Sequence, residues 1–465
     1  MTEEKAEAGQ KLYTRMRLWE FPDQYVIEPT DGSNGSSLAV SRVDGSMSLI
    51  EKLPESSSVR VPKIRTIFGV VGVLKLLAGS YLLVITEREC VGSYLGHPIY
   101  KVSSFKVYPC DHSLRNSPAE QKKMETEFSA LLNIAERTPG LYFSYEANLT
   151  LSAQRLNDLG NESKLLPLWR QAEPRFLWNN YMLENLIDNK LDPYLLPIVQ
   201  GSILMSFMLS AVSHVLSHHF QAAIGKDIID VTLIARRCTR RNGSSASGRA
   251  AFSGFKKKYG AVLAVDLVNT HGGEGRLSEK FANAMQHIVS DDLRYWHFDF
   301  HHICGHIHFE RLSILYEQIV DFLDRNGYLL LNEKGEKMKE QLGVVRTNCI
   351  DCLDRTNVTQ SMIGRNISHP NLDECFKILW ADHGDDVSIQ YSGTPALKGI
   401  FGQCKESLRM ESIPFYAIIT ITSVMELNRM QLTFCKDITL LLLHSHWLCH
   451  CFDWVLFCDF VIEAS

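Results

Sequence analysis

The sequence lacks an excess of basic residues. Its 48 lysines and arginines stand against 53 aspartates and glutamates, which gives a formal net charge of -5. A chain without a global positive field does not attract polyanions over its whole surface, so any anion site must be local. We therefore expect no nucleic acid as a partner.

A secretory signal is also absent, because the first ten residues are acidic and polar. The 12 cysteines are consequently expected to be reduced thiols in the cytosol. Long apolar stretches are few. Lys75 and a Gly-Ser turn interrupt the apolar residues 67–85, so this segment is predicted to form two buried strands. Residues 438–462 contain three histidines and two aspartates, which makes a membrane span there unfavourable.

What is present is a change of pattern along the chain. Residues 12 to about 150 are rich in strand signals, with a hairpin predicted where Asp44-Gly45-Ser46 separates Ser37–Val43 from Met47–Ile50. A helix is predicted over Pro118–Arg137. From Lys256 onward strands alternate with helices, and the apolar run Ala261–Val268 is typical of a strand buried on both faces.

The segment RTNCIDCLDRTN, residues 346–357, is the most informative. Cys349 is followed by five residues and then by Arg355 and Thr356, between a short predicted strand and a helix predicted to start near Thr356. A loop that curls onto a helix N-terminus directs backbone N–H groups at one point and forms an anion site. Arg355 adds a planar fork for two phosphoryl oxygens.

This arrangement predicts a nucleophile as well as a binding site. The positive field of the loop is expected to lower the pKa of the Cys349 thiol, so that a thiolate is available at neutral pH. A thiolate that faces a bound phosphate monoester displaces the alcohol and forms a phospho-cysteine, which water then hydrolyses. Thr356 is placed to donate a hydrogen bond to the leaving thiolate. The scheme requires no metal and no cofactor.

The full string, Arg-x-Asn-Cys-x-Asp-Cys-Leu-Asp-Arg-Thr-Asn, resembles the catalytic signature of the Sac-domain phosphoinositide phosphatases. Residues 12–202 resemble the N-terminal subdomain of that family and its junction with the catalytic part. Residues 256–399 resemble the core of the catalytic part, closest to plant members. The expected fold is mixed α/β (α+β): a strand-rich N-terminal subdomain, residues 1–175, followed by an α/β cysteine-phosphatase-like catalytic subdomain, residues 176–399.

The resemblance also implies an activity. The family removes the monoester phosphate of phosphatidylinositol 4-phosphate, with the 3-phosphate and the 3,5-bisphosphate as further candidates, and does not depend on a metal. Its partners are phosphoinositide lipids at the cytoplasmic face of endoplasmic reticulum and Golgi membranes. The alternative is a catalytically impaired, truncated isoform that only binds phosphoinositide headgroups.

The loop residues receive roles from the same resemblance. Asp351 is favoured as the general acid that protonates the leaving inositol oxygen, and Asp354 as a residue that braces the loop through backbone hydrogen bonds. Either carboxylate has a simpler interpretation as a loop cap. The residues expected to surround the phosphoryl group are Ile350, Cys352, Leu353 and Asp354.

Three other patterns have competing interpretations. Cys349 and Cys352 form C-x-x-C, a redox or zinc motif, but zinc needs a second pair nearby and redox chemistry leaves Arg355 and Thr356 unexplained. The basic cluster is either a solvated face or a contact for anionic lipid and additional phosphates; it comprises Arg236, Arg237, Arg240 and Arg241. A polar cluster that suggests metal ligands is interpreted instead as structural, hydrogen-bonding side chains: His297, Asp299, His301, His302, His306 and His308.

The glycine-rich sequence of residues 272–275, which includes Glu274, lacks the spacing of a nucleotide-binding fingerprint and is predicted to be a turn.

The chain departs from the family in three places. Residues 203–219 interrupt the junction and are interpreted as inserted, whereas residues 242–255 replace a longer strand-rich stretch. Resemblance ends at Gly399, and residues 400–465 form a non-family tail. Codons that encode Gly248–Phe255 or Met425–Leu440 yield family-like text when they are read one base out of frame, which suggests frame-shifted segments. The usual C-terminal membrane anchor of the family is expected to be missing.

Overall fold

The computed structural model describes three long parts of the chain and a few isolated positions between them. The parts are residues 11–110 without 32–35, 55–61, 76–78 and 95; residues 140–237 without 205–206, 211–216 and 225–226; and residues 256–392 without 306–307, 333, 351 and 368–372. Helices and several sheets are both present, which confirms the mixed α/β class.

The described residues divide into two compact units. The first contains the residues up to Leu151 together with Asp158–Gln200, and the second contains Ser152–Asn157 and the residues from Gly201 onward. This division follows spatial contacts, so the family boundary predicted between residues 175 and 176 stays a prediction.

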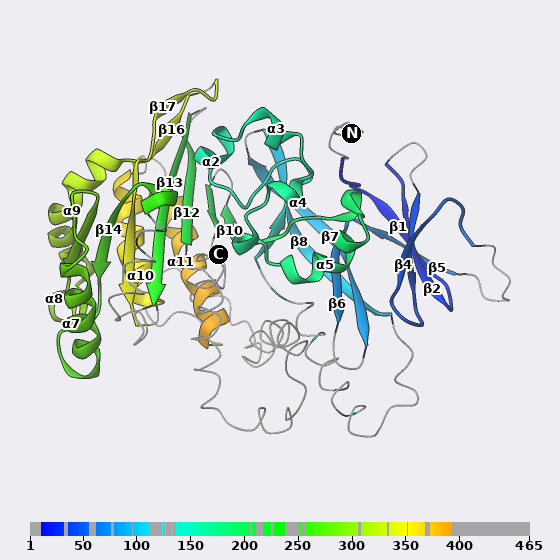
Figure 1. Cartoon of the computed structure of the whole chain (residues 1–465), viewed down its shortest axis with the longest axis horizontal. Helices are drawn as coiled ribbons and strands as arrows, with labels where there is room; N and C mark the ends of the chain where they lie inside the picture. Colours follow the sequence, from blue (N-terminus) through cyan, green and yellow to red (C-terminus); the bar gives the residue numbers. More distant parts are fainter. Residues whose placement is uncertain are drawn as a thin grey trace, which may run out of the picture. The chain divides into compact units, whose positions relative to one another are not determined.

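The first unit begins with a five-stranded antiparallel sheet in the order β4-β3-β2-β1-β5 (Figure 1). Its strands are β1 (Met16–Glu20), β2 (Gln24–Pro29), β3 (Ser37–Ser41), β4 (Met47–Ile50) and β5 (Lys63–Ile67). The predicted hairpin is confirmed as β3–β4. Gly45 has a φ of 71° at the turn, and the backbone and hydroxyl of Ser46 both donate to the Asp44 carboxylate.

A second antiparallel sheet completes this unit. It contains β6 (Gly69–Lys75), β7 (Ser80–Tyr94), β8 (His97–Pro109) and β9 (Leu141–Phe143). The two strands β6 and β7 confirm the interpretation of residues 67–85 as a buried strand pair. Apolar side chains of both sheets, among them Leu18, Ile27 and Leu82, share one buried cluster, and its burial is the main term that stabilises the unit.

Short helices cover part of this unit: α3 (Asn161–Lys164), α4 (Leu168–Gln171), η2 (Pro174–Phe176), α5 (Asn180–Asp188) and η3 (Asp192–Tyr194). Helix α5 lies so close to β6 that a Cβ on Gly72 would meet the Met182 carbonyl oxygen at 2.4 Å. The helix predicted over Pro118–Arg137 falls mostly outside the described residues.

The second unit is built on a sheet in which four adjacent strands, called the central strands below although β15 is at the edge, are parallel. They are β15 (Leu293–His297), β14 (Ala261–Asp266), β18 (Gly343–Cys349) and β13 (Asp227–Arg237), in that spatial order. Three antiparallel strands follow on the β13 side: β12 (Ser217–Ile224), β11 (Phe207–Ser210) and β10 (Val199–Leu204). Because the central strands are parallel, their carboxyl ends meet at one edge of the sheet.

The remaining elements of this unit are two short strands and a set of helices. They are β16 (Leu329–Leu331), β17 (Lys337–Lys339), α2 (Ala153–Asn157), α7 (Gly272–Gln286), α8 (Phe300–Cys304), η4 (Phe309–Arg311), α9 (Leu312–Asn326), α10 (Asp354–Ile367) and α11 (Asp373–Ser392). None of the helices within the described residues combines the length and apolar character that a membrane crossing requires.

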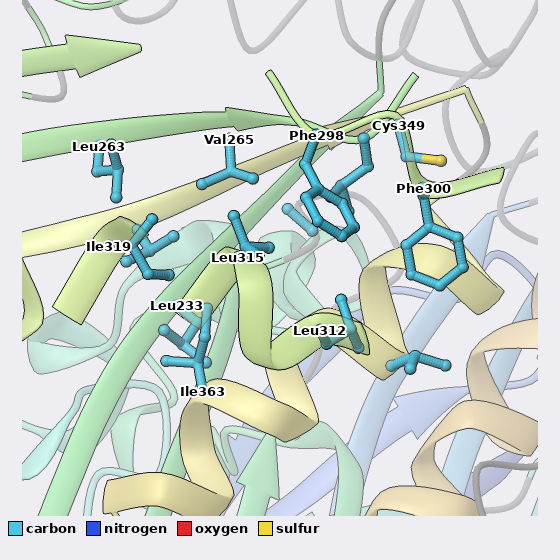
Figure 2. Close-up of a cluster of buried hydrophobic side chains, with 14 of the residues drawn as sticks. Leu233, Leu263, Val265, Phe298, Phe300, Leu312, Leu315, Ile319, Cys349 and Ile363 are labelled. Carbon is cyan, nitrogen blue, oxygen red and sulfur yellow. The ribbon is translucent and has the colours of Figure 1, made fainter. Parts of the chain in front are cut away.

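Helices cover both faces of the central strands. Leu263 and Val265 of β14 pack with Leu315 of α9 (Figure 2). Val262 and Ala264 pack on the opposite face with Phe281 of α7, so the packing partners alternate along the strand. Successive residues of a strand point to opposite faces, so a strand between two helical layers is apolar throughout. This explains the continuous apolar run at residues 261–268.

Parts of the segment interpreted as inserted lie in this sheet. Residues 203–204 end β10, residues 207–210 form β11, and residues 217–219 begin β12. The insertion itself stays a prediction, because a strand position does not reveal where a segment came from.

A buried carboxylate connects β13 with the start of α2. Asp230 is almost fully buried and accepts hydrogen bonds from the backbone N–H groups of Ala153 and Gln154, and burial raises the pKa of this carboxyl from 3.8 to about 7. A group whose pKa is raised on folding contributes its stability at low pH and loses it as the pH rises through the folded value. Between pH 4 and pH 8 the loss amounts to roughly 4 kcal/mol.

We therefore predict that Asp230→Asn becomes more stable relative to the unsubstituted chain as the pH rises from 4 to 8. The measurement is the difference in melting temperature between the two proteins across that range. Asp291→Asn, which removes an exposed carboxylate, serves as the control and should show a flat difference. A flat difference for Asp230→Asn as well would contradict a raised pKa.

Candidate active site

The C-x5-R segment lies where a central strand ends and a helix begins. Cys349 is the last residue of β18, and α10 starts at Asp354, two residues before the predicted start. Between them Cys352 has a φ of 59°, in the left-handed region that residues other than glycine rarely adopt. The strand and the helix predicted on either side of the motif are therefore confirmed, and the loop between them is tightly turned.

Cys349 belongs to the apolar side of the sheet that α9 and α10 cover. Its side chain has 0% exposure and shares a cluster with Phe298 and Phe300 (Figure 2). In the strand register Cys349 stands beside Arg237 of β13, and the preceding Asn348 stands beside Asp266 of β14. The thiol thus lies at the shared carboxyl edge of the parallel strands, where open α/β sheets bind their ligands.

Two buried polar side chains of the motif have no hydrogen-bond partner among the described residues. They are the hydroxyl of Thr356 and the amide of Asn348, both at 0% exposure. Buried polar groups are nearly always paired, so each exception requires an explanation. A hydroxyl that lies one residue after Arg355 and lacks a protein partner fits the predicted role toward a ligand or a thiolate.

Arg355 is held by a carboxylate from another helix. Its Nη1 and Nη2 atoms donate to Oε2 and Oε1 of Glu274 at 2.9 and 3.0 Å, and Nη1 also donates to the Leu267 carbonyl oxygen at 3.2 Å. Glu274 accepts a further hydrogen bond from the Asn269 backbone N–H at 3.1 Å. The hydrogen bonds from Arg355 hold the pKa of Glu274 below its usual value, so this carboxylate is ionised at neutral pH.

The prediction of a turn at residues 272–275 is wrong. These residues form the first turn of α7, and Gly272, with a φ of 69°, begins it. Gly275 allows the helix to approach the preceding loop, because a Cβ there would meet the Thr270 carbonyl oxygen at 2.2 Å. Sequence reasoning missed Glu274, and its one local signal was an acidic residue in a helix's first turn.

The polar cluster near β15 makes hydrogen bonds within the protein. Asp299 caps α8 by accepting from the backbone N–H of His302 at 3.0 Å and also accepts from the backbone N–H of Thr270 at 2.9 Å. His297 bonds to the Val268 carbonyl oxygen at 2.9 Å. The structural interpretation is confirmed for Asp299 and His297, and His306 lies outside the described residues. Within the described ranges no three His, Cys, Asp or Glu residues form a group that could hold a metal ion.

The structure gives less detail for several other predicted site residues. Asp351, Arg240 and Arg241 lie outside the described residues, and of Arg236 and Arg237 only the strand positions in β13 are described. Cys352 is buried, and its Sγ lies 3.9 Å from the Cys349 carbonyl oxygen. Cys349 and Cys352 are not joined by a disulfide.

Comparison with known proteins agrees with this architecture. Residues 68–251 and 245–305 match the family model of the SacI homology domain. The chain is 61% identical to the phosphoinositide phosphatase SAC6 of Arabidopsis thaliana over 473 aligned positions, which cover 84% of this chain and 77% of that protein. It is 38% identical to the phosphoinositide phosphatase SAC8 of the same plant, over 84% and 77%. Identity to the phosphatidylinositol-3-phosphatase SAC1 of Drosophila melanogaster is 28%, over 84% and 76%.

A parallel strand that ends in a cysteine, followed by a loop and a helix that carries an arginine, is an α/β arrangement that can bind a phosphoryl group. The chain belongs to the SacI homology family, whose members named above are phosphoinositide phosphatases.

Proposed function

We propose that this chain removes the monoester phosphate of phosphatidylinositol 4-phosphate through a phospho-cysteine on Cys349. The observation that carries the proposal is the position of Cys349 at the end of a central parallel strand, with Arg355 in the first turn of the following helix. The names of the plant relatives support phosphoinositides as the substrate class. The name of the Drosophila relative supports the 3-phosphate as a further candidate. The 3,5-bisphosphate is a candidate from the resemblance of the motif alone.

The proposed first step transfers the phosphoryl group to the enzyme. The Cys349 thiolate attacks phosphorus, the S–P bond forms, and the bond from phosphorus to the inositol oxygen breaks. Asp351 gives its proton to that oxygen, and the inositol lipid leaves as an alcohol. Arg355 and the backbone of the loop bind the other phosphoryl oxygens; the loop residues are Ile350, Cys352, Leu353 and Asp354.

The second step regenerates the Cys349 thiolate. Asp351, now ionised, takes a proton from a water molecule, the water oxygen attacks phosphorus, and the S–P bond breaks. Thr356 donates a hydrogen bond to the departing Cys349 thiolate, and inorganic phosphate leaves. The buried Thr356 hydroxyl, which has no partner among the described residues, supports this role.

The basic cluster is proposed to contact anionic lipid or additional phosphates of the headgroup. The strand position of Arg237 beside Cys349 supports it, because that position is at the same edge of the sheet as the thiol. The proposed site of action is the cytoplasmic face of endoplasmic reticulum and Golgi membranes.

We also propose that residues 242–255 replace a longer family stretch, that residues 203–219 are inserted and that residues 400–465 are a non-family tail. Two findings support the first point. The family matches meet at residues 245–251, and the alignment with the 61% relative has 473 positions although the whole chain has 465 residues. The genomic DNA tests all three points: it should contain the missing family sequence in another frame or in an intron.

The experiment that tests the function measures phosphate release from soluble, short-chain phosphatidylinositol 4-phosphate. We expect turnover that excess EDTA changes less than about twofold, because the thiolate and the guanidinium supply the charge that a metal provides elsewhere. The 3-phosphate and the 3,5-bisphosphate, assayed in parallel, establish the preferred position. Abolition of release by EDTA, with recovery on added metal, would contradict the metal-independent mechanism.

One observation favours the alternative, a chain that binds headgroups without turnover. Cys349 has 0% exposure, so a phosphate reaches it only after the loop or its neighbours move. Binding of short-chain phosphatidylinositol 4-phosphate without release, by a chain whose circular dichroism shows a folded protein, would establish this alternative.

A further inference from the structure

The pair between Glu274 and Arg355 has a geometry that the proposed reaction leaves unexplained. Glu274 comes from the first turn of α7, 81 residues before Arg355, and both side chains are largely buried, with 23% and 20% exposure. A bidentate pair between a guanidinium and a carboxylate defines the orientation of the guanidinium plane as well as its position.

The contacts use a particular edge of the guanidinium. An arginine side chain carries five N–H bonds, two on each Nη and one on Nε. Glu274 accepts one from Nη1 and one from Nη2, and the Leu267 carbonyl oxygen accepts from Nη1. The edge formed by Nε and Nη2 also has the spacing of two phosphoryl oxygens. A carboxylate and a phosphoryl group can therefore bind the same guanidinium at different edges.

Glu274 is itself held in place. Its Oε2 atom accepts hydrogen bonds from both Arg355 and the Asn269 backbone N–H. The first turn of α7 packs tightly on the preceding loop, because a Cβ on Gly275 would clash with the Thr270 carbonyl oxygen. The carboxylate is consequently a fixed support, whereas an arginine without one has several rotatable bonds and loses entropy when it binds phosphate.

We infer that Glu274 is a positioning residue for the phosphatase reaction: its two carboxylate oxygens hold Nη1 and Nη2 of Arg355 and so define the plane in which the guanidinium meets the phosphoryl group. This inference rests on the proposed function of the loop that contains Cys349 and Arg355. An opposite effect is physically conceivable, because the negative charge of Glu274 also repels a phosphate. The two effects differ in sign, so measurement separates them.

The test uses the full chain with Glu274→Ala and with Glu274→Gln, which keeps one acceptor oxygen and removes the charge. We expect Glu274→Ala to lower kcat/KM on the order of 100-fold, the effect of misplacing a catalytic group by about 1 Å, and Glu274→Gln to have a smaller effect in the same direction. Glu279→Ala removes an exposed carboxylate from the same helix and should leave activity unchanged.

A second readout separates positioning from a merely structural role. Orthovanadate, a phosphate analogue, is titrated into each folded protein at equilibrium. We expect Glu274→Ala to bind it about tenfold more weakly. This loss of affinity is smaller than the loss of kcat/KM, because ground-state binding needs less exact alignment than the transition state. The double variant Glu274→Ala with Arg355→Ala should be no worse than Arg355→Ala alone, since Glu274 acts only through Arg355.

Three results would overturn the inference. The orthovanadate affinity of Glu274→Ala could be unchanged, or it could be higher, which would identify Glu274 as a barrier to phosphate. The third is a double variant whose loss of kcat/KM, expressed as a free energy, is the sum of the two single losses. Failure of the proposed function is a separate result, namely no phosphate release by the unsubstituted chain. Orthovanadate affinity needs no turnover, so it still decides whether Glu274 positions Arg355.

Discussion

Cys349→Ser is expected to reduce phosphate release from phosphatidylinositol 4-phosphate by about a thousandfold or more, the scale on which loss of a nucleophile is measured in other enzymes. The serine hydroxyl is a poor nucleophile at neutral pH without a strong base, whereas a cysteine next to a helix N-terminus reacts as a thiolate. The substitution changes one buried atom at the end of β18, so the fold should persist.

The matched control is Cys90→Ser. Cys90 is an exposed free cysteine in β7, in the first compact unit, and its loss should leave the rate unchanged. Circular dichroism and melting temperature establish that both variants are folded. Release by Cys349→Ser within tenfold of the unsubstituted rate would exclude the phospho-cysteine mechanism, because no covalent intermediate could then form at this position.

Arg355→Lys is expected to lower kcat/KM by about a thousandfold, comparable to the effect of an arginine that stabilises a transferring phosphoryl group elsewhere. Lysine keeps the positive charge but has no planar fork, so it cannot bind Glu274 through two nitrogens and the phosphoryl oxygens through an edge. The loss of kcat/KM in Arg355→Lys therefore measures the contribution of the planar guanidinium geometry and not that of the positive charge.

The control for this substitution is Arg365→Lys, at an exposed position in the last turn of the same helix, α10. The result also separates the phosphatase from a C-x-x-C thiol protein, whose redox chemistry at Cys349 and Cys352 does not need a guanidinium. Full phosphate release by Arg355→Lys would contradict the role of the guanidinium. No phosphate release by the unsubstituted chain, together with a dithiol reactivity at Cys349 and Cys352 that Arg355→Lys leaves unchanged, would favour the thiol protein.

Local patterns were sufficient for the elements that surround the motif. The β3–β4 hairpin follows from the Asp-Gly-Ser turn between two alternating segments, and the buried strand β14 from an unbroken apolar run. The roles proposed for Cys349, Arg355 and Thr356 also come from the sequence alone, because a five-residue loop between a strand and a helix is expected to form an anion site within a single stretch of chain.

Helix boundaries that depend on tertiary contacts were harder to predict from the sequence. Helix α7 begins at Gly272, inside a glycine-rich sequence that predicted a turn. Glycine disfavours a helix on its own by about 1 kcal/mol. The tertiary contacts of Glu274 with Arg355 and the close approach of Gly275 to Thr270 stabilise the helical turn instead.

Local sequence patterns were enough to predict the mixed α/β class, the strand–loop–helix around Cys349 and the residue types that the proposed reaction uses, since each depends on neighbours a few positions apart. The tertiary structure alone decided that Glu274 holds Arg355, that Arg237 stands beside Cys349 and that Asp230 is buried against the start of α2. Those contacts join residues roughly 75 to 110 positions apart. Their register comes from how the parallel strands pair and how the helices pack against them, which no local periodicity encodes.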